Sequence, residues 1–374
     1  MQNIPLFKIL WDDDDLAEVE RAITAGSHWA IGPNVSKFEN RLAEFVGTDF
    51  CTVFNSGTSA LHSTLLAMHI GSGDEVIVPS FTFIATANAP LFTGAKPIFA
   101  DIEEETYGLD PEDVKERITQ KTKAIIPIHY GGCPCKIGDL REVADDYHLA
   151  LIEDAAEALG ARIGSKRVGG FGDSAVLSFC QNKIITTGEG GAVVTNSKEV
   201  DDNSRRIRSH GRSDDGDYFS SNDLTDYLTI GYNFRMSNIT AALGLSQLSK
   251  IHDIIEMRRQ NAEFLTSKLK KEVKDVVPPI PPQGYYHVYQ MYSVRAPKKD
   301  KLMTVLADRG IATKTYFYPV HLTSFYKNLL KCTCELPITE KVSNEILALP
   351  MYPGLTEDEM SYTVDEIKNF YDNE

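Results

Sequence analysis

The chain has 374 residues, of which 42% are hydrophobic and 24% charged, and 38 basic against 53 acidic residues give it a formal net charge of −15. This composition is typical of a soluble globular protein, and its negative charge disfavours nucleic acid or an anionic membrane surface as the main partner. The apolar runs are far shorter than the roughly 20 residues of a membrane helix, and the start, MQNIPLFKILWDDDD, lacks a secretion signal. We therefore expect a cytoplasmic protein that acts on a small molecule.

Residues 50–195 repeat a short apolar run, a turn and a segment with helical spacing, which is the pattern of an α/β fold. The runs are apolar almost throughout, as expected for strands that are buried on both faces of a mainly parallel sheet. The expected strands are 51–54, 75–79, 96–100, 124–129, 150–153, 175–178 and 192–195. The helices expected to cover them are 58–69, 82–92, 111–117 and 137–147.

The pattern changes after residue 238, where a long helical stretch runs towards residue 270 and the proline-rich run 278–284 ends it. Strand-like segments at 287–294 and 312–318 then alternate with helical segments at 299–309 and 357–370. We expect a large α/β domain over residues 1–250 and a smaller α+β domain over residues 251–374.

The turn after the first expected strand carries small and hydroxylated residues. Asn55-Ser56-Gly57-Thr58-Ser59-Ala60 follows that strand and opens a helix. Free backbone N–H groups at a helix N-terminus form a ready site for an anion such as a phosphate, and the hydroxyls of Thr58 and Ser59 add donors. Taken alone, the turn also fits an ordinary helix cap.

Two further residues complete a pattern. Asp154 lies at the carboxyl end of an expected strand, the edge of an open α/β sheet where ligands bind, and Lys183 lies between a strand and a glycine-rich turn. Pyridoxal phosphate needs a lysine amine for its Schiff base, a carboxylate beside its pyridine nitrogen and N–H donors for its phosphate. The three elements together match this cofactor, although Lys183 alone would be read as a surface lysine.

Metal and nicotinamide sites are not indicated. Cys133 with Cys135, and Cys332 with Cys334, are spaced more tightly than usual zinc ligands, and only His129 lies close to either pair. The six cysteines are too few for a disulfide framework, so we expect reduced thiols and no metal. The nearest approach to Gly-x-Gly-x-x-Gly, at 71–76, lacks the third glycine and precedes a strand, which disfavours a dehydrogenase.

The stretch SFCQNKIITTGEGG, at 178–191, resembles the lysine motif of the DegT-type sugar aminotransferases, which are fold type I pyridoxal-phosphate enzymes. The resemblance covers nearly the whole chain. Its other motifs are GPNVSKFE at 32–39, NSGTSALH at 55–62, PSFTFIATANA at 79–89, EDAAEALGA at 153–161, GYNFRMSNITAALGLSQL at 231–248, GIATKTYFYPVHL at 310–322 and LPMYPGLTEDE at 349–359.

The resemblance implies a role for each matching residue. Lys183 would form the Schiff base, Asp154 would face the pyridine nitrogen, and Phe83 would stack on the ring. Gly57, Thr58, Ser59 and Ser178 would bind the phosphate, and Asn233 would reach it from the other subunit of a homodimer, which places the active site at the subunit interface. The residues expected around the substrate are His129, Tyr130, Tyr316, His321 and Arg235. Without the resemblance, Phe83 would be interpreted as ordinary core. Asn233 and Arg235 would be interpreted as a loop end, and the histidines as buried or rim residues.

One position departs from the common family pattern. Many members have Gln or His beside the ring oxygen of the cofactor, whereas this chain has Glu157, a carboxylate that is expected to shift the proton equilibrium there. The sequence EDAAEALGA together with Asn182-Lys183 is most similar to the GDP-perosamine synthases. The implied reaction moves an amino group from L-glutamate to a nucleotide-linked 4-keto-6-deoxyhexose, for cell-surface polysaccharide or amino-sugar synthesis.

Two alternatives stay open. The substrate could be a UDP- or dTDP-linked 4-keto or 3-keto sugar, or the protein could be a non-catalytic regulator that binds the cofactor. A sugar 3-dehydratase of this fold is disfavoured, because its histidine replaces the Schiff-base lysine. Since the cofactor and the sugar nucleotide are both anionic, we expect Lys183, Arg212 and Arg235 to make a locally positive cleft in an acidic shell.

Overall fold

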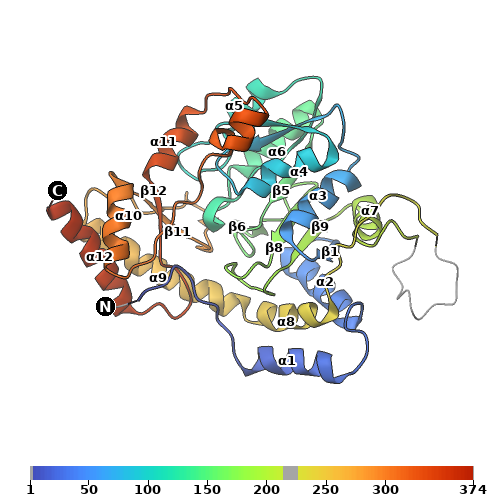
Figure 1. Ribbon diagram of the computed structural model, residues 1–374, viewed down its shortest axis with the longest axis horizontal. Helices are drawn as coiled ribbons and strands as arrows, with labels where there is room; N and C mark the ends of the chain where they lie inside the picture. Colours follow the sequence, from blue (N-terminus) through green and yellow to red (C-terminus); the bar gives the residue numbers. More distant parts are fainter. Residues whose placement is uncertain (1–2, 214–225, 374) are drawn as a thin grey trace.

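A computed structural model describes residues 3–213 and 226–373 of the chain (Figure 1). Its centre is a seven-stranded sheet with the strand order β1-β9-β8-β5-β4-β2-β3. In chain order these strands are β1 Phe50–Phe54, β2 Glu75–Pro79, β3 Lys96–Ala100, β4 Thr122–Ile125, β5 Ala150–Asp154, β8 Ser174–Ser178 and β9 Gly191–Thr195.

The sheet is mainly parallel. β3, β2, β4, β5 and β8 run parallel to one another, and only β9 runs the other way, antiparallel to both β8 and β1. The α/β fold class is confirmed, and all seven expected strands are present. β4 is shorter than expected, because the chain beyond Ile125 keeps only isolated contacts, such as the bridge between Ile128 and Asp154.

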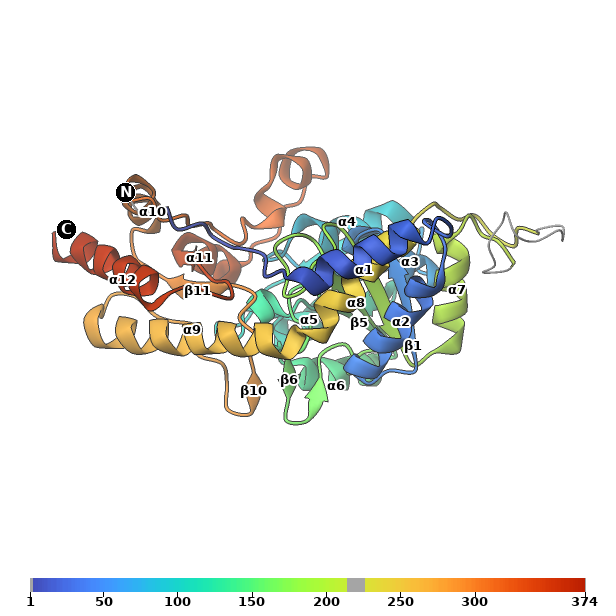
Figure 2. The same cartoon turned by 90° about the horizontal axis from the view of Figure 1, so that it is seen from below.

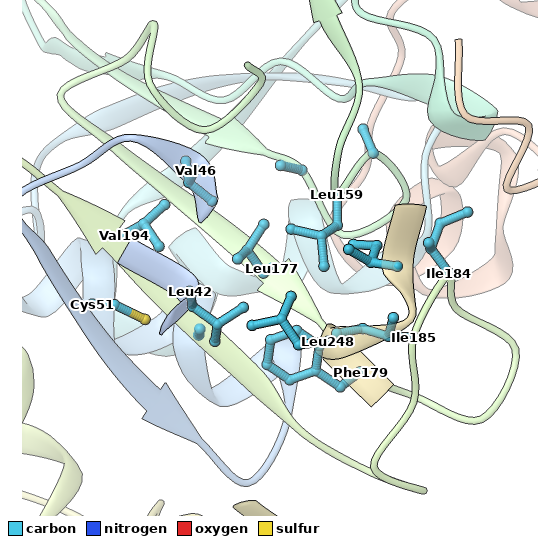
Figure 3. Close-up of a cluster of buried hydrophobic side chains, with 14 of the residues drawn as sticks. Leu42, Val46, Cys51, Leu159, Leu177, Phe179, Ile184, Ile185, Val194 and Leu248 are labelled. Atoms are coloured by element: carbon cyan, nitrogen blue, oxygen red, sulfur yellow. The ribbon is translucent and has the colours of Figure 1, made fainter. Parts of the chain in front are cut away.

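Helices cover both faces of the sheet. α2 Pro33–Val46 and α8 Asn238–Ser249 bury Leu42 and Leu248 against one face, where Leu177 and Val194 point (Figure 3). α5 Pro111–Arg117 and α6 Ile137–Tyr147 continue this layer over Ile125. The opposite face carries α3 Gly57–Ala67, α4 Ile84–Thr93 and α7 Lys198–Arg208. Because neighbouring strand residues point to opposite faces, strands without polar positions are expected between two helical layers.

The expected long helix is two helices, α8 and α9 Ile251–Glu272, which meet at Lys250. The Lys250 Nζ lies 2.6 Å from Asp12 Oδ1 and 2.7 Å from Asp15 Oδ2, at the start of α1 Asp13–Thr24. Figure 2 shows α1 alongside α8, and α9 continuing towards the C-terminal elements. These two ion pairs therefore fix the point at which the chain leaves the sheet region.

The C-terminal region has its own apolar core beside α9. A two-stranded antiparallel sheet, β11 Tyr292–Arg295 with β12 Ile346–Leu349, packs with α10 Lys299–Asp308 and α12 Glu357–Asp372. The first residues of the chain join this region, since the Ile4 N–H donates to the Gly310 carbonyl at 2.8 Å. The remaining elements are β6 Arg162–Ile163, β7 Lys166–Arg167, β10 Tyr285–Tyr286, α11 Pro337–Glu345 and the single turns Tyr130–Gly132, Val320–Leu322 and Phe325–Leu329.

Two expectations for this region need correction. The expected strand at 287–294 is reduced to β11, and the expected strand at 312–318 is wrong, since that segment keeps only one bridge, between Lys314 and Ala348. An apolar, β-branched run forms a strand only where a partner strand is available, and here β12 pairs with the segment at a single residue. Among the described residues, no helix has the length and apolar character needed to cross a membrane.

Candidate active site

Lys183 lies in the turn between β8 and β9, and its side chain is 14% exposed. Its Nζ is 3.5 Å from Glu157 Oε1, and the other Glu157 oxygen accepts a hydrogen bond from the Gly131 N–H at 2.9 Å. Burial raises the pKa of Glu157, although the neighbouring Lys183 opposes this. The amine and the carboxylate thus form a buried pair at the sheet edge.

Asp154 ends β5 and is 3% exposed. Its Oδ2 accepts from the Thr86 hydroxyl at 2.6 Å, and its Oδ1 accepts from the Ala156 N–H at 3.1 Å. The Thr82 hydroxyl lies 2.8 Å from that of Thr86 and donates to it, because the Thr86 proton is used on Asp154. Burial raises the pKa of Asp154, while these donors and Lys183 act against the shift. A nearby cation therefore stabilises the charged form of this carboxylate.

The small-residue turn lies at the N-terminus of α3. Ser56 caps this helix by accepting from the Ser59 N–H at 3.1 Å. As the first residues of the helix, Gly57 and Thr58 have N–H groups without intrahelical acceptors, and Thr58 is exposed. A β-carbon on Gly57 would lie 3.2 Å from Ser178 Cβ, so the glycine lets the turn approach the end of β8 closely. The expected phosphate residues are thus neighbours.

Phe83 directly precedes α4 and is 58% exposed, with its ring centroid 6.2 Å from that of Phe317. An aromatic side chain exposed to this degree is not ordinary core, so that alternative is wrong. Phe83 and Thr86 both belong to the start of α4, and Thr86 bonds Asp154. Thr86 was missed from the sequence, although a hydroxyl one helical turn after an aromatic residue was a usable signal.

The two histidines expected at the substrate lie away from open space. His129 is fully buried, with its Nε2 3.0 Å from Glu153 Oε2, and its Nδ1 accepts from the Cys135 N–H at 3.1 Å. His321 is 2% exposed, and its Nδ1 is 2.6 Å from Ser80 Oγ. Both ring nitrogens of His129 are therefore engaged within the protein, and the His321 Nε2 lies 3.4 Å from Glu340 Oε1.

Of the other expected substrate residues, Tyr130 is 3% exposed; its hydroxyl donates to the Tyr316 carbonyl and accepts from the Ser293 hydroxyl at 3.1 Å. Tyr316 is half-buried; burial raises the pKa of Tyr316, and a hydrogen bond with the Asn182 side chain opposes this. Tyr316 is therefore close to Asn182, the residue that precedes Lys183, and the buried Tyr130 contacts the Tyr316 backbone.

Asn233 and Arg235 lie in the segment that leads to α8. Asn233 is exposed and pairs with Ser209 through its backbone, and the Arg235 Nη1 donates to Ser209 Oγ at 3.1 Å. Burial lowers the pKa of Arg235, and Arg212 and Arg208 lower it further. Arg235 thus lies close to two other guanidinium groups, of which Arg208 is paired with Glu39 at 2.6 Å.

The sequence profile described as the DegT/DnrJ/EryC1/StrS aminotransferase family matches residues 11–368. The chain belongs to this family. It is 39% identical over 380 residues to a GDP-perosamine synthase of Escherichia coli O157:H7, with 99% of each chain covered. It is 36% identical, again over 99% of each, to a pleiotropic regulatory protein of Geobacillus stearothermophilus. Among solved structures, Helicobacter pylori PseC, an aminotransferase of pseudoaminic acid biosynthesis, superposes with a TM-score of 0.93 at 28% identity, covering 100% of both chains.

The protein is therefore a pyridoxal-phosphate-dependent sugar aminotransferase of the DegT family with the fold of that family. The residues present fit the cofactor. A buried carboxylate lies at Asp154, an amine at Lys183, an exposed aromatic ring at Phe83 and a helix N-terminus at Gly57. Over the ranges that the structure describes, no cluster of three or more His, Cys, Asp or Glu side chains is arranged to hold a metal ion.

Proposed function

We propose that this DegT-family aminotransferase moves an amino group from L-glutamate to a nucleotide-linked 4-keto-6-deoxyhexose, as a GDP-perosamine synthase would. The observation that carries the proposal is the 39% identity, over essentially the full length of both chains, to a relative named GDP-perosamine synthase. The buried pair of Lys183 and Glu157 beside Asp154 supports transamination as the chemistry. The product would serve cell-surface polysaccharide or amino-sugar synthesis.

Each residue has a defined task in this proposal. Pyridoxal phosphate, when bound, supplies the carbonyl that takes up the donor's nitrogen and the ring that withdraws electrons from the reacting carbon. Lys183 would hold the cofactor through its Nζ and, when free, would carry the proton from the donor's α-carbon to the carbon on the other side of the transferred nitrogen. Asp154 keeps the pyridine nitrogen protonated, and Thr86 keeps Asp154 oriented.

The remaining residues bind and orient. Gly57, Thr58, Ser59 and Ser178 receive the phosphate at the N-terminus of α3, where the helix dipole favours an anion. Phe83 would cover one face of the ring, and Glu157 would lie against the ring oxygen. Tyr316 and Arg235 remain the expected substrate contacts. His129 and His321 support the site through Glu153 and Ser80.

We further propose a homodimer in which Asn233 of each subunit reaches the phosphate site of the other. Asn233 is exposed, and nearby Leu228 and Ile230 are 57% and 81% exposed, which is unusual for apolar side chains that no partner covers. The domain boundary is proposed at residues 250 and 251, with the first residues around Ile4 packed on the smaller domain. A cytoplasmic location is part of the proposal and agrees with six free cysteines.

The decisive experiment loads the protein with pyridoxamine phosphate and offers a panel of GDP-, UDP- and dTDP-linked 4-keto and 3-keto sugars. We expect turnover with the GDP-linked 4-keto-6-deoxyhexose; preference for another sugar nucleotide would select the runner-up. A regulator without activity is the second alternative, favoured by the relative named pleiotropic regulatory protein. It would show no spectral change with glutamate. Full turnover by Lys183→Ala would refute the assignment of Lys183.

A further inference from the structure

We propose that Gln290 is a positioning residue for Lys183, and that Arg258, buried in α9, holds Gln290 in place. The inference rests on the role proposed above for Lys183, and it adds two residues outside every motif that identified the site. It connects the C-terminal region by hydrogen bonds to Asn182, the residue that precedes the reacting lysine.

Arg258 begins this series. The residue is 2% exposed, and its Nη1 donates to the carbonyls of Tyr289 at 3.1 Å, Gln290 at 3.4 Å and Met351 at 3.1 Å. Within the described ranges its hydrogen bonds all go to backbone carbonyls, and burial lowers the pKa of Arg258 to about 10. A buried cation is costly and therefore calls for an explanation. Here it joins two separate backbone segments at one point.

Gln290 is the next link. It is 5% exposed, and its Nε2 donates to the carbonyl of Asn182, the residue before Lys183. A carbonyl can only accept, so the amide end that faces Asn182 must be the NH₂ group. The other end, Oε1, is buried and has no partner among the described residues. A side chain that leaves one buried acceptor unpaired is retained at a cost in stability, which indicates that its donor end is needed.

Asn182 and its surroundings complete the connection. The Asn182 carbonyl receives Gln290, and the Asn182 side chain forms a hydrogen bond with Tyr316. One small cavity of about 20 Å³ is lined by Asn182, Gln290, Tyr316 and Met351, so these four residues meet at one place. Movement of the Asn182 carbonyl would displace the next residue, Lys183, whose Nζ lies 3.5 Å from Glu157.

The test uses Gln290→Met, which keeps the volume of the side chain and removes both the donor to Asn182 and the unpaired oxygen. A purely structural role predicts equal or higher thermal stability and unchanged catalysis. A positioning role predicts equal or higher stability together with a kcat lowered about tenfold or more and KM within about twofold. Gln260→Met makes the same substitution at an exposed site on α9, where Gln260 bonds only Glu256, and should change neither quantity.

A second readout needs neither turnover nor cofactor. In the cofactor-free protein, the pH dependence of Lys183 acylation, followed by mass spectrometry, reports the pKa of its amine. We expect its midpoint to shift in Gln290→Met and in Arg258→Met, and to return towards the wild-type value in Arg258→Lys. If Arg258→Met fails to fold, Gln290→Met alone decides.

The proposal is overturned if Gln290→Met keeps kcat within twofold of the wild type and leaves the Lys183 midpoint unchanged. Failure of the proposed function would instead appear as full turnover by Lys183→Ala, whatever the result for Gln290→Met.

Discussion

The backbone nitrogen of Gly57 lies only 2.5 Å from the position that a β-carbon would occupy on Gly191. Gly191 begins β9, opposite Phe54, and presses against the turn proposed to bind the cofactor phosphate. Gly191→Ala would have to push this turn away, because backbone atoms cannot yield as a flexible side chain does. We expect cofactor affinity, measured by equilibrium dialysis, to fall about 10- to 100-fold.

Gly138→Ala is the matched control. Gly138 lies in α6, and an added β-carbon there would meet no atom within 4 Å. Alanine favours a helix by up to about 1 kcal/mol over glycine, so this variant should bind cofactor normally and unfold at the same or a higher temperature. Normal affinity in Gly191→Ala would show that the α3 turn does not hold the phosphate.

Asp154→Asn should leave the fold intact and remove the carboxylate. An asparagine cannot keep the pyridine nitrogen protonated, so kcat/KM is expected to fall by about 10²- to 10³-fold. Thr86→Val removes the donor to Oδ2, together with the acceptor of the Thr82 hydroxyl, and should cost about tenfold. Steady-state kinetics at saturating cofactor give both values, and an Asp154→Asn enzyme within tenfold of the wild type would contradict the assignment.

Much of the site could be predicted from the sequence because its residues follow strands. An apolar strand that ends in Asp154, and a lysine between β8 and β9, are local features, and local order along the chain fixed their positions at the sheet edge. His129 shows the limit. Whether its ring faces the substrate or Glu153 depends on which side of the sheet the chain turns to after β4, and no local pattern encodes that.

The C-terminal region was less predictable for a related reason. The segment 312–318 has strand-like composition, but pairing depends on an edge supplied by residues near Ala348. Gln290 and Arg258 were also out of reach, because an unremarkable glutamine and a helical arginine acquire importance only through contacts with Asn182 and with distant carbonyls.

A buried ion network supports the sheet away from the candidate site. Glu39 is 4% exposed and lies 2.6 Å from Arg208 and 2.9 Å from Arg205, and it accepts from the Val53 N–H at 3.0 Å. Burial acts to raise the pKa of Glu39, but the two arginines hold it below its ordinary value. Glu39→Ala would remove the carboxylate partner of the buried Arg208, while Arg205 keeps Asp201 at 2.9 Å, and should cost about 3–5 kcal/mol in the free energy of unfolding.

Chemical denaturation measures this loss. Glu44→Ala on the same helix is the control, since the Glu44 side chain is 73% exposed and lies 3.7 Å from the exposed Arg41. Such surface pairs contribute about 0–1 kcal/mol. Equal losses in the two variants would mean that the buried network contributes no more than a surface pair.

Stability should fall as the pH drops below neutrality, and His287 should account for part of the fall. Burial and then Arg259 lower the pKa of His287 to about 3, whereas the unfolded chain has a value near 6.5. Below pH 6.5 the unfolded state thus binds a proton that the folded state does not, so the folded state loses stability. Between pH 7 and pH 5 this amounts to about 2 kcal/mol.

The comparison is between the wild type and His287→Gln, each unfolded by denaturant at both pH values. The change in the free energy of unfolding between the two pH values should be smaller by about 2 kcal/mol in the variant. His148→Asn, at an exposed position, should leave the difference as it is in the wild type. An unchanged difference in His287→Gln would show that this histidine is not buried in its neutral form.

The pairing of Ile4 with Ile311 has a consequence for motion. The chain passes between the two regions near residues 5–12 and at Lys250 (Figure 2), and C-terminal segments also return to the sheet region, as where the Val320 N–H donates to the Ser80 carbonyl at 2.9 Å. Rotation of the C-terminal region about either crossing would strain the other or break the Ile4 pairing. Access for the sugar substrate is therefore expected to depend on local loop rearrangement rather than on a hinge between two rigid halves.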